Sequence, residues 1–172
     1  MSIDVDAAAE LRSRTISWHD PVATAAIGAE MAGLDYVRAV QAGELPPPPI
    51  AVVMNFSIAE LQEGKAAFIG EPGEEHYNPI GVVHGGYAAT ILDSVLGCAV
   101  HTTLPAGIGY TSQTLEVKYL RAITRDTGAV RAEAEVLHRG SKTATSEARL
   151  TSVASGKLLA TGTSTCLIIE NR

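Results

Sequence analysis

The sequence predicts an α+β fold in one domain, in which a curved antiparallel sheet wraps around one long buried helix and a helical extension precedes the sheet. The chain has 172 residues, of which 46% are hydrophobic, and this is enough for one folded core. One segment is apolar at helical spacing on almost every side, and the segments after it alternate apolar and polar residues. A helix followed by strands packs most simply as a sheet that encloses the helix.

The first part of the chain predicts the helical extension. Residues 21–41 are rich in alanine, and larger apolar side chains recur among them at helical spacing. Gly43 and the prolines at 46–49 then end the helix. We therefore expect an N-terminal helical extension over residues 1–44 and the main domain over residues 45–172.

Two short strands and a loop are expected next. Residues 50–58 and 65–69 are strand-like apolar runs, and Glu63-Gly64 between them suits a hairpin turn. A loop over residues 71–83 then leads to the long helix.

The long helix is expected over residues 84–103. Two apolar stripes run along it at four-residue spacing, and its other faces carry mainly small side chains. Asp93 is the only formally charged residue between His84 and His101. A lone carboxylate in so apolar a helix destabilises the fold unless it is paired. Asp93 is therefore a candidate functional residue.

The sequence after the long helix changes to the period of a strand. Residues 115–119 alternate apolar and charged side chains, and residues 130–136 repeat this pattern. Two more strands are expected over residues 143–152 and 157–169, joined by a turn at residues 154–156. Together these segments predict an antiparallel meander of about four strands.

Composition narrows the range of partners. The formal net charge is −6 and no basic run occurs, which disfavours nucleic acid because phosphate binding needs clustered Lys and Arg. No apolar run is long enough to span a bilayer, and the acidic N-terminal segment is unlike a signal peptide. The two cysteines, Cys98 and Cys166, indicate no disulfide framework. We therefore expect a cytoplasmic protein with no membrane or nucleic-acid partner.

The residues before the long helix form a motif. Residues 76–86 read HYNPIGVVHGG, so that Asn78 lies six positions before His84, and Asp93 lies nine positions after it. This frame resembles the single-domain hotdog-fold acyl-CoA thioesterases of the phenylacetate-degradation type. The likeness covers roughly residues 45–169 and includes further positions at Tyr119-Leu120-Arg121, Gly140 and Gly156. It implies a hotdog fold and hydrolysis of a small acyl-CoA or aryl-CoA thioester to the free acid and CoA.

The start of the helix suits a thioester carbonyl. Gly85 and Gly86 lie in its first turn, where backbone N–H groups lack partners within the helix, and without Cβ they let a ligand approach closely. Such donors stabilise the charge that develops on the oxygen as water attacks, by about 3 kcal/mol each in known enzymes. Asn78 either adds a side-chain amide or holds the loop. His84 caps the helix or acts in the chemistry, and within the family it mostly positions the loop.

Asp93 is the candidate base or nucleophile. Nine helical residues at about 1.5 Å each place it about 13 Å along the axis from His84, so one chain cannot easily aim both residues at one carbonyl. The simplest remedy is a two-fold homodimer in which the helix start of one subunit meets Asp93 of the other. The family is similar in this respect. We therefore expect a homo-oligomer, either a dimer with composite active sites or a tetramer.

The resemblance also implies roles for residues on the strands. The family places a small hydroxyl residue seven positions before the tyrosine, which here is Ser112, and it would orient water beside Asp93. The turn over residues 138–142 offers cations to the phosphates of CoA, as family members do. The candidates for binding substrate or CoA are Gly86, Thr111, Arg139, Gly140, Ser141 and Lys142. Those for lining the acyl pocket are Tyr87, Tyr110, Met54 and Phe56.

Other functions lack their sequence features. There is no G-x-S-x-G elbow, no P-loop, no complete G-x-G-x-x-G and no zinc-type His/Cys cluster, so no metal or cofactor is expected. His19, His101 and His138 show no ligand spacing, and we assign them no function. Two alternatives remain. One is an acyl-thioester dehydratase or hydratase of the same fold, which would need a paired acid and base, and the other is a non-catalytic acyl-CoA sensor.

Overall fold

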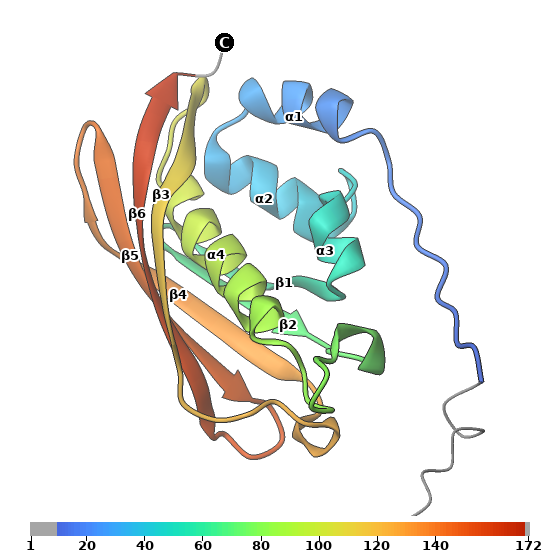
Figure 1. The fold of residues 1–172 in the computed structure, drawn as a ribbon. Coiled ribbons are helices and arrows are strands. Elements are labelled where there is room, and N and C mark those ends of the chain that lie inside the picture. The colour runs from blue at the N-terminus through green and yellow to red at the C-terminus, as the bar shows by residue number, and fades with distance from the viewer. Residues whose placement is uncertain (1–9, 171–172) are drawn as a thin grey trace, which may run out of the picture.

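The computed structural model describes residues 10–170, which form a curved sheet with a layer of helices on its inner side (Figure 1). In chain order the helices are α1 (Pro21–Ala29), α2 (Gly33–Ala42), α3 (Pro49–Val53) and α4 (Gly85–His101). The strands are β1 (Phe56–Gln62), β2 (Lys65–Gly70), β3 (Ile108–Tyr119), β4 (Val130–Arg139), β5 (Thr143–Ser152) and β6 (Leu158–Glu170). The predicted α+β class and the curved antiparallel sheet around one long helix are confirmed.

The sheet has the order β1-β2-β4-β5-β6-β3, and each neighbouring pair is antiparallel. Strands β4, β5 and β6 form the expected meander, with Gly156 at positive φ in the last turn. The expectation that β3 simply begins this meander is wrong. Residues 120–129 carry the chain across the end of the sheet, so β3 pairs with β6 and lies at the sheet edge.

Helix α4 lies in the core, as its sequence predicts. Ile91, Leu92, Val95 and Leu96 have no exposed surface, and the helix contacts all six strands. Burial of each such side chain stabilises the fold by about 1.5–3 kcal/mol. The helix therefore has a fixed position, and its polar residues are held against the surrounding strands.

Two predictions about the N-terminal half need correction. The single helix expected over residues 21–41 is two helices, α1 and α2, separated by a turn at residues 30–32. The strand expected over residues 50–58 begins only at Phe56, because Pro49 starts the short helix α3. The end of α2 at Gly43, in left-handed conformation with φ 76°, agrees with the prediction.

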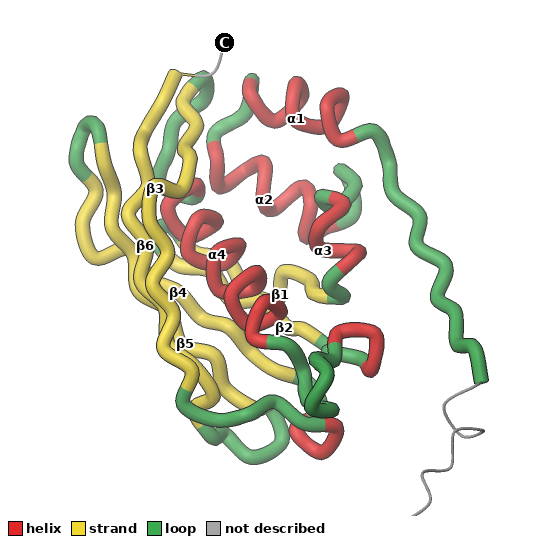
Figure 2. The backbone as a smooth tube through the Cα atoms, in the orientation of Figure 1, coloured by secondary structure: helices red, strands yellow, loops and turns green. Residues whose placement is uncertain are grey.

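Helix α2 of the extension lies beside α4, and α1 packs next to α2 (Figure 2). Helix α2 contacts both β1 and α4, and Gly33 donates a backbone hydrogen bond to Leu104 O at 2.9 Å. The predicted boundary at residue 44 therefore stays a prediction, with extensive packing across it. Within residues 10–170, no helix has the length and apolar character needed to cross a membrane.

Candidate functional site

Asn78 holds the loop that leads into α4. Its Oδ1 accepts hydrogen bonds from the backbone N–H groups of Ile80 at 3.1 Å and Val82 at 3.2 Å. Since both neighbours are donors, the side-chain oxygen must face them and the amide nitrogen must face away. Nδ2 makes no hydrogen bond with any residue from 10 to 170. Asn78 can thus hold the loop and still offer a donor.

His84 caps the start of α4. Its Nδ1 accepts a hydrogen bond from Gly86 N–H at 2.8 Å, and its backbone oxygen accepts one from Tyr87 N–H at 2.9 Å. The expectation that both glycine amides are open to a ligand is therefore wrong for Gly86. Among the described residues, none accepts a hydrogen bond from Gly85 N–H. The helix start offers this one backbone donor, reinforced by the positive end of the helix dipole.

Tyr119 packs directly against Gly85. Its hydroxyl donates to Gly85 O at 3.2 Å, and a Cβ built on Gly85 would lie only 3.2 Å from the tyrosine ring. His84, Gly85 and Tyr119 line a pocket of about 290 Å³ at this end of α4. From the sequence, Tyr119 had significance only as a position shared with the family. Tyr119 is the last residue of β3, so its contact with Gly85 depends on how this strand lies against the start of α4. The sequence alone does not specify that arrangement.

Asp93 and Ser112 form the second half of the candidate site. Ser112 Oγ on β3 donates a hydrogen bond to Asp93 Oδ1 on α4, with an oxygen–oxygen distance of 2.9 Å. The neighbouring hydroxyl, Thr111, makes no contact of this kind and does not line the pocket at Asp93. Side chains alternate between the two faces of a strand, so only one of the two hydroxyls can face α4.

A pocket of about 560 Å³ lies over Asp93 and Ser112. It is bounded by α4 and β3 on one side and by α2, α3 and β1 on the other. Phe56 and Phe68 stack in its wall with ring centroids 5.7 Å apart. Of the four suggested lining residues, Phe56 and Tyr110 do line it, whereas Tyr87 and Met54 do not. The participation of α2 and α3 could not be seen in the sequence pattern.

Within one chain the two halves of the site are separate. His84 and Gly85 line the smaller pocket, Asp93 and Ser112 line the larger one, and neither of these two pockets contains both pairs. The nine helical residues between His84 and Asp93 span about 13 Å. A single subunit therefore does not aim the free amide of Gly85 and the carboxylate of Asp93 at the same atom.

The turn proposed for CoA lies between β4 and β5. Gly140 N–H donates to Thr143 O at 2.8 Å, and Lys142 O accepts from Ile168 N–H at 2.8 Å, so the backbone of the turn is well fixed. Arg139, Ser141 and Lys142 are exposed, and neither cation forms an ion pair with a described residue. This turn lines neither the pocket at Gly85 nor the pocket at Asp93.

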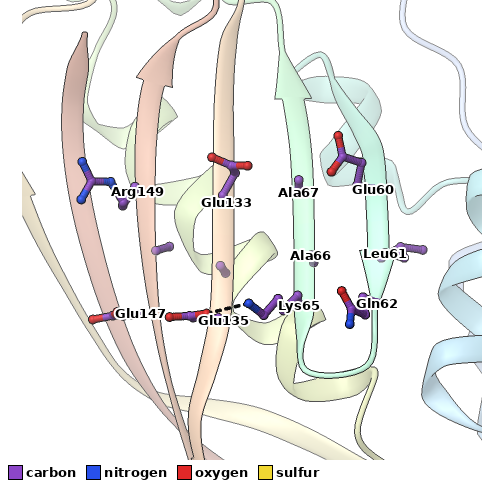
Figure 3. A pocket seen from close by; sticks show the side chains of 12 residues that line it. Glu60, Leu61, Gln62, Lys65, Ala66, Ala67, Glu133, Glu135, Glu147 and Arg149 are labelled. Atoms are coloured by element: carbon purple, nitrogen blue, oxygen red, sulfur yellow. Dashed lines mark ion pairs between the residues drawn. The ribbon is translucent and has the colours of Figure 1, made fainter. Parts of the chain in front are cut away.

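A third hollow lies on the sheet face opposite α4 (Figure 3). Its polar side chains are mainly charged and form exposed ion pairs, such as Lys65–Glu135 at 3.0 Å. Arg131 likewise pairs with Glu60 and Glu133, each at 2.9 Å. Exposed pairs of this kind stabilise weakly and indicate a solvated face. Among the residues the structure describes, no group of His, Cys, Asp or Glu side chains could hold a metal ion.

Comparison with known sequences places this chain in a family. The sequence profile of the thioesterase superfamily matches residues 80–158, a range that includes His84, Gly85, Asp93 and Ser112. Human acyl-coenzyme A thioesterase 13 is 31% identical over 111 residues, which are 64% of this chain and 78% of the human protein.

Solved structures show the same fold. A phenylacetic acid degradation-related protein from Ralstonia eutropha superposes with a TM-score of 0.70 at 28% identity, covering 77% of this chain and 98% of that chain. A variant of the phenylacetic acid degradation protein PaaI from Thermus thermophilus has a TM-score of 0.63 at 26% identity, covering 70% and 98%. The fold is therefore the hotdog fold, as the resemblance implied. The chain belongs to the thioesterase superfamily.

Proposed function

We propose that the protein hydrolyses the CoA thioester of a small acyl or aryl acid, giving the free acid and CoA with water as the only co-substrate. Membership of the superfamily and the likeness to an acyl-coenzyme A thioesterase support this activity. The observation that carries the mechanism is the Ser112–Asp93 hydrogen bond at a pocket of about 560 Å³. Pockets of this size bind small organic molecules.

The active site is proposed to form between two subunits. Gly85 N–H and Asn78 Nδ2 of one subunit would meet Asp93 and Ser112 of the other, because in a single chain Gly85 lines the smaller pocket while Asp93 and Ser112 line the larger one. Strand β3 offers the means of association. It lies at the sheet edge and carries Leu115 at 39% and Tyr119 at 57% exposure. A long unprotected edge strand is a template for pairing with another chain.

Two-fold pairing of β3 strands would bring the halves of the site together. Ser112 and Tyr119 lie seven residues apart on one strand, about 23 Å at the rise of an extended chain. The β-bulge between Ser112 and Thr114 places the side chains of Ser112 and Tyr119 on the same face of β3. If the two-fold axis passes beside Glu116, antiparallel pairing sets Tyr119 opposite the partner subunit's Ser112. Tyr119 contacts Gly85, and Ser112 contacts Asp93. One symmetric interface therefore generates two composite sites, and further association to a tetramer would leave them intact.

The chemistry follows from these positions. The thioester oxygen accepts hydrogen bonds from Gly85 N–H and Asn78 Nδ2, which stabilise the negative charge as it develops. Asp93 removes a proton from water that Ser112 orients, and the water oxygen bonds to the carbonyl carbon. When the carbon–sulfur bond breaks, the thiolate takes the proton from Asp93 and leaves as CoA.

Direct attack by Asp93 on the carbonyl carbon is the second route open to the same carboxylate. It would expel the thiolate and give a mixed anhydride, which water then hydrolyses. Quenching a single turnover with hydroxylamine distinguishes the two routes. Conversion of Asp93 to its hydroxamate would support direct attack, and unmodified Asp93 with full product release would support the general base.

Binding of the CoA nucleotide is proposed at the exposed cations Arg139 and Lys142. Gly140 and Ser141 complete this turn. The assignment of Gly86 and Thr111 to substrate binding stays a prediction, because Gly86 N–H is bonded to His84 and Thr111 does not line the pocket at Asp93. The side chains of Arg139 and Lys142 are free to meet phosphates because neither is paired within the described chain. A cytoplasmic location, expected from the sequence, agrees with the free thiols of Cys98 and Cys166.

Thiol release from a panel of acyl-CoA substrates tests the activity directly. Hydrolysis supports the proposal, whereas tight binding of CoA esters without release of thiol would favour a sensor. Formation or hydration of an enoyl-CoA would favour a dehydratase or hydratase. That reaction needs an acid and a base on one substrate, yet His84 Nδ1 already accepts a hydrogen bond from Gly86 N–H.

A further inference from the structure

Three polar rings line the pocket that holds Asp93. Tyr36 comes from α2, His101 from the last turn of α4, and Tyr110 from β3. His101 lies between the two tyrosines, with its ring centroid 5.6 Å from that of Tyr36 and 5.5 Å from that of Tyr110. None of these residues is adjacent to another in the sequence, and the fold brings them together.

The polar atoms of these rings are unpartnered in the described part of the chain. Neither tyrosine hydroxyl and neither ring nitrogen of His101 makes a hydrogen bond with residues 10–170. Burial raises the pKa of both hydroxyls and lowers the pKa of His101, so all three groups are neutral near pH 7. These atoms are not fully enclosed, since among the described residues only the Tyr87 hydroxyl is buried without a partner. They border the pocket, where a ligand or water can supply the missing hydrogen bonds.

Close packing against glycines fixes each ring. A Cβ on Gly28 would come within 2.6 Å of the Tyr36 ring, and a Cβ on Gly97 within 2.6 Å of the Tyr110 ring. At Gly33 a Cβ would likewise meet the His101 ring at 2.6 Å. Real Cβ atoms do not approach other atoms so closely. Any residue larger than glycine at these three positions would therefore overlap one of the rings. The rings are therefore held in position before a ligand binds.

The three rings lie at a defined distance from the reacting centre. His101 follows Asp93 by eight residues on α4, which is about 12 Å along the helix axis. Tyr110 precedes Ser112 by two residues on β3, so both side chains lie on the same face of the strand. An acyl group with its carbonyl at Asp93 and Ser112 would thus extend past Tyr110 toward His101 and Tyr36.

We propose that Tyr36, His101 and Tyr110 bind the far end of the acyl group, and that the preferred substrate is an elongated acyl-CoA with a neutral hydroxyl or keto oxygen at that end. This assignment rests on the proposed thioesterase function and replaces the small acyl group of that proposal by a longer chain, because His101 lies about 12 Å along α4 from Asp93. The hydrogen-bonding atoms are neutral and can both donate and accept, which suits a hydroxyl or a carbonyl. A carboxylate would be disfavoured, because the carboxylate of Asp93 lines the same pocket.

The fold also explains why a plain hydrocarbon chain would bind less well. It would fill the apolar wall formed by Phe56 and Phe68 but leave the polar ring atoms without partners. Sites built to bind a substrate hydroxyl reject analogues that lack it, because their own polar groups then stay unpaired. Tyr36 belongs to the N-terminal extension, so the extension takes part in selecting the acyl group.

Three substrates test this assignment in the full-length protein: butyryl-CoA, decanoyl-CoA and ω-hydroxydecanoyl-CoA. We expect kcat/KM for the hydroxylated substrate to exceed that for decanoyl-CoA at least about tenfold. Hydrolysis of decanoyl-CoA and ω-hydroxydecanoyl-CoA at equal kcat/KM would overturn the assignment while leaving the thioesterase function intact. Failure to cleave all three substrates and also an aryl substrate such as phenylacetyl-CoA would instead contradict the thioesterase function.

The double variant Tyr36→Phe/Tyr110→Phe removes two hydroxyls and keeps both rings. Its ratio of kcat/KM for the two decanoyl substrates should fall toward one, because the ratio cancels any general loss of activity. Tyr87→Phe is the matched control, since Tyr87 lies on α4 outside this pocket, and it should keep the wild-type ratio. A double variant that kept the wild-type ratio would remove the two tyrosines from substrate selection. If the double variant does not fold, the two single variants provide the same ratio.

Discussion

Ser112 and Asp93 are joined by a hydrogen bond of 2.9 Å that links strand β3 to the middle of α4. The bond fixes the carboxylate at the pocket and leaves the second carboxylate oxygen, Oδ2, without a side-chain partner in residues 10–170. An acceptor oxygen held beside a hydroxyl suits the binding of one water molecule.

Replacement of Asp93 by Asn should lower kcat at least about a hundredfold, the lower end for loss of a general base. The amide oxygen can still accept the hydrogen bond from Ser112, so the protein should fold and bind substrate with little change in KM. Steady-state kinetics and thermal unfolding check both parts. Asp126→Asn, at an exposed turn, is the matched control. Near-normal turnover in a folded Asp93→Asn protein would exclude Asp93 from the mechanism.

Replacement of Ser112 by Ala should lower kcat about tenfold, because the water loses one orienting hydrogen bond while the base remains. Ser112→Thr keeps the hydroxyl and should retain most of the activity. Ser94 lines the same pocket without a side-chain hydrogen bond to any described residue, and Ser94→Ala should change kcat far less. Equal losses of kcat in Ser112→Ala and Ser112→Thr would contradict a role for the hydroxyl in orienting water.

Two substitutions at Asn78 separate its role in the loop from its role as a donor. Asn78→Asp keeps an oxygen that accepts from Ile80 and Val82, but it removes the Nδ2 donor and adds negative charge. We expect kcat to fall about tenfold in Asn78→Ala and further in Asn78→Asp, because the added charge repels the developing oxyanion. Steady-state kinetics of both variants measure these changes in kcat. Full activity in Asn78→Asp would mean that Asn78 only holds the loop.

Tyr87 carries a hydroxyl that is buried without a hydrogen-bond partner in the described chain. Tyr87→Phe should raise the free energy of unfolding by about 1 kcal/mol, because an unpaired buried polar group is removed. Urea denaturation measures this change. Tyr119→Phe removes a hydroxyl that does have a partner, Gly85 O, and should give no such gain. A lower stability of Tyr87→Phe would indicate that this hydroxyl is satisfied after all.

The sequence predicted α4 and the later strands well, because burial imposes a clear period on such elements. It failed at α3, since the run Ile50-Ala51-Val52-Val53 is typical of strands and only tertiary packing after Pro49 makes it helical. It also failed to place β3, because register and neighbours depend on how the chain crosses the sheet end.

The candidate site shows the same division between local and long-range information. Asn78, His84, Gly85 and Asp93 share one segment, and the resemblance of that segment to the family's motif selected them. His101 was assigned no function, since its significance depends on Tyr36 and Tyr110, which reach it only in the folded protein. The engagement of Gly86 N–H by His84 likewise depends on a side-chain rotamer that no sequence pattern specifies.

The central claim is that each active site takes Asn78 and Gly85 from one subunit and Asp93 and Ser112 from the other. Its most direct test is a heterodimer of an Asn78→Ala chain and an Asp93→Asn chain, isolated with two different tags. Composite sites place both defects in one site and leave the other intact, so the heterodimer should recover roughly half of the wild-type kcat. A heterodimer with only the low activity of the two parent homodimers would show that each chain builds its own site, and would contradict the account.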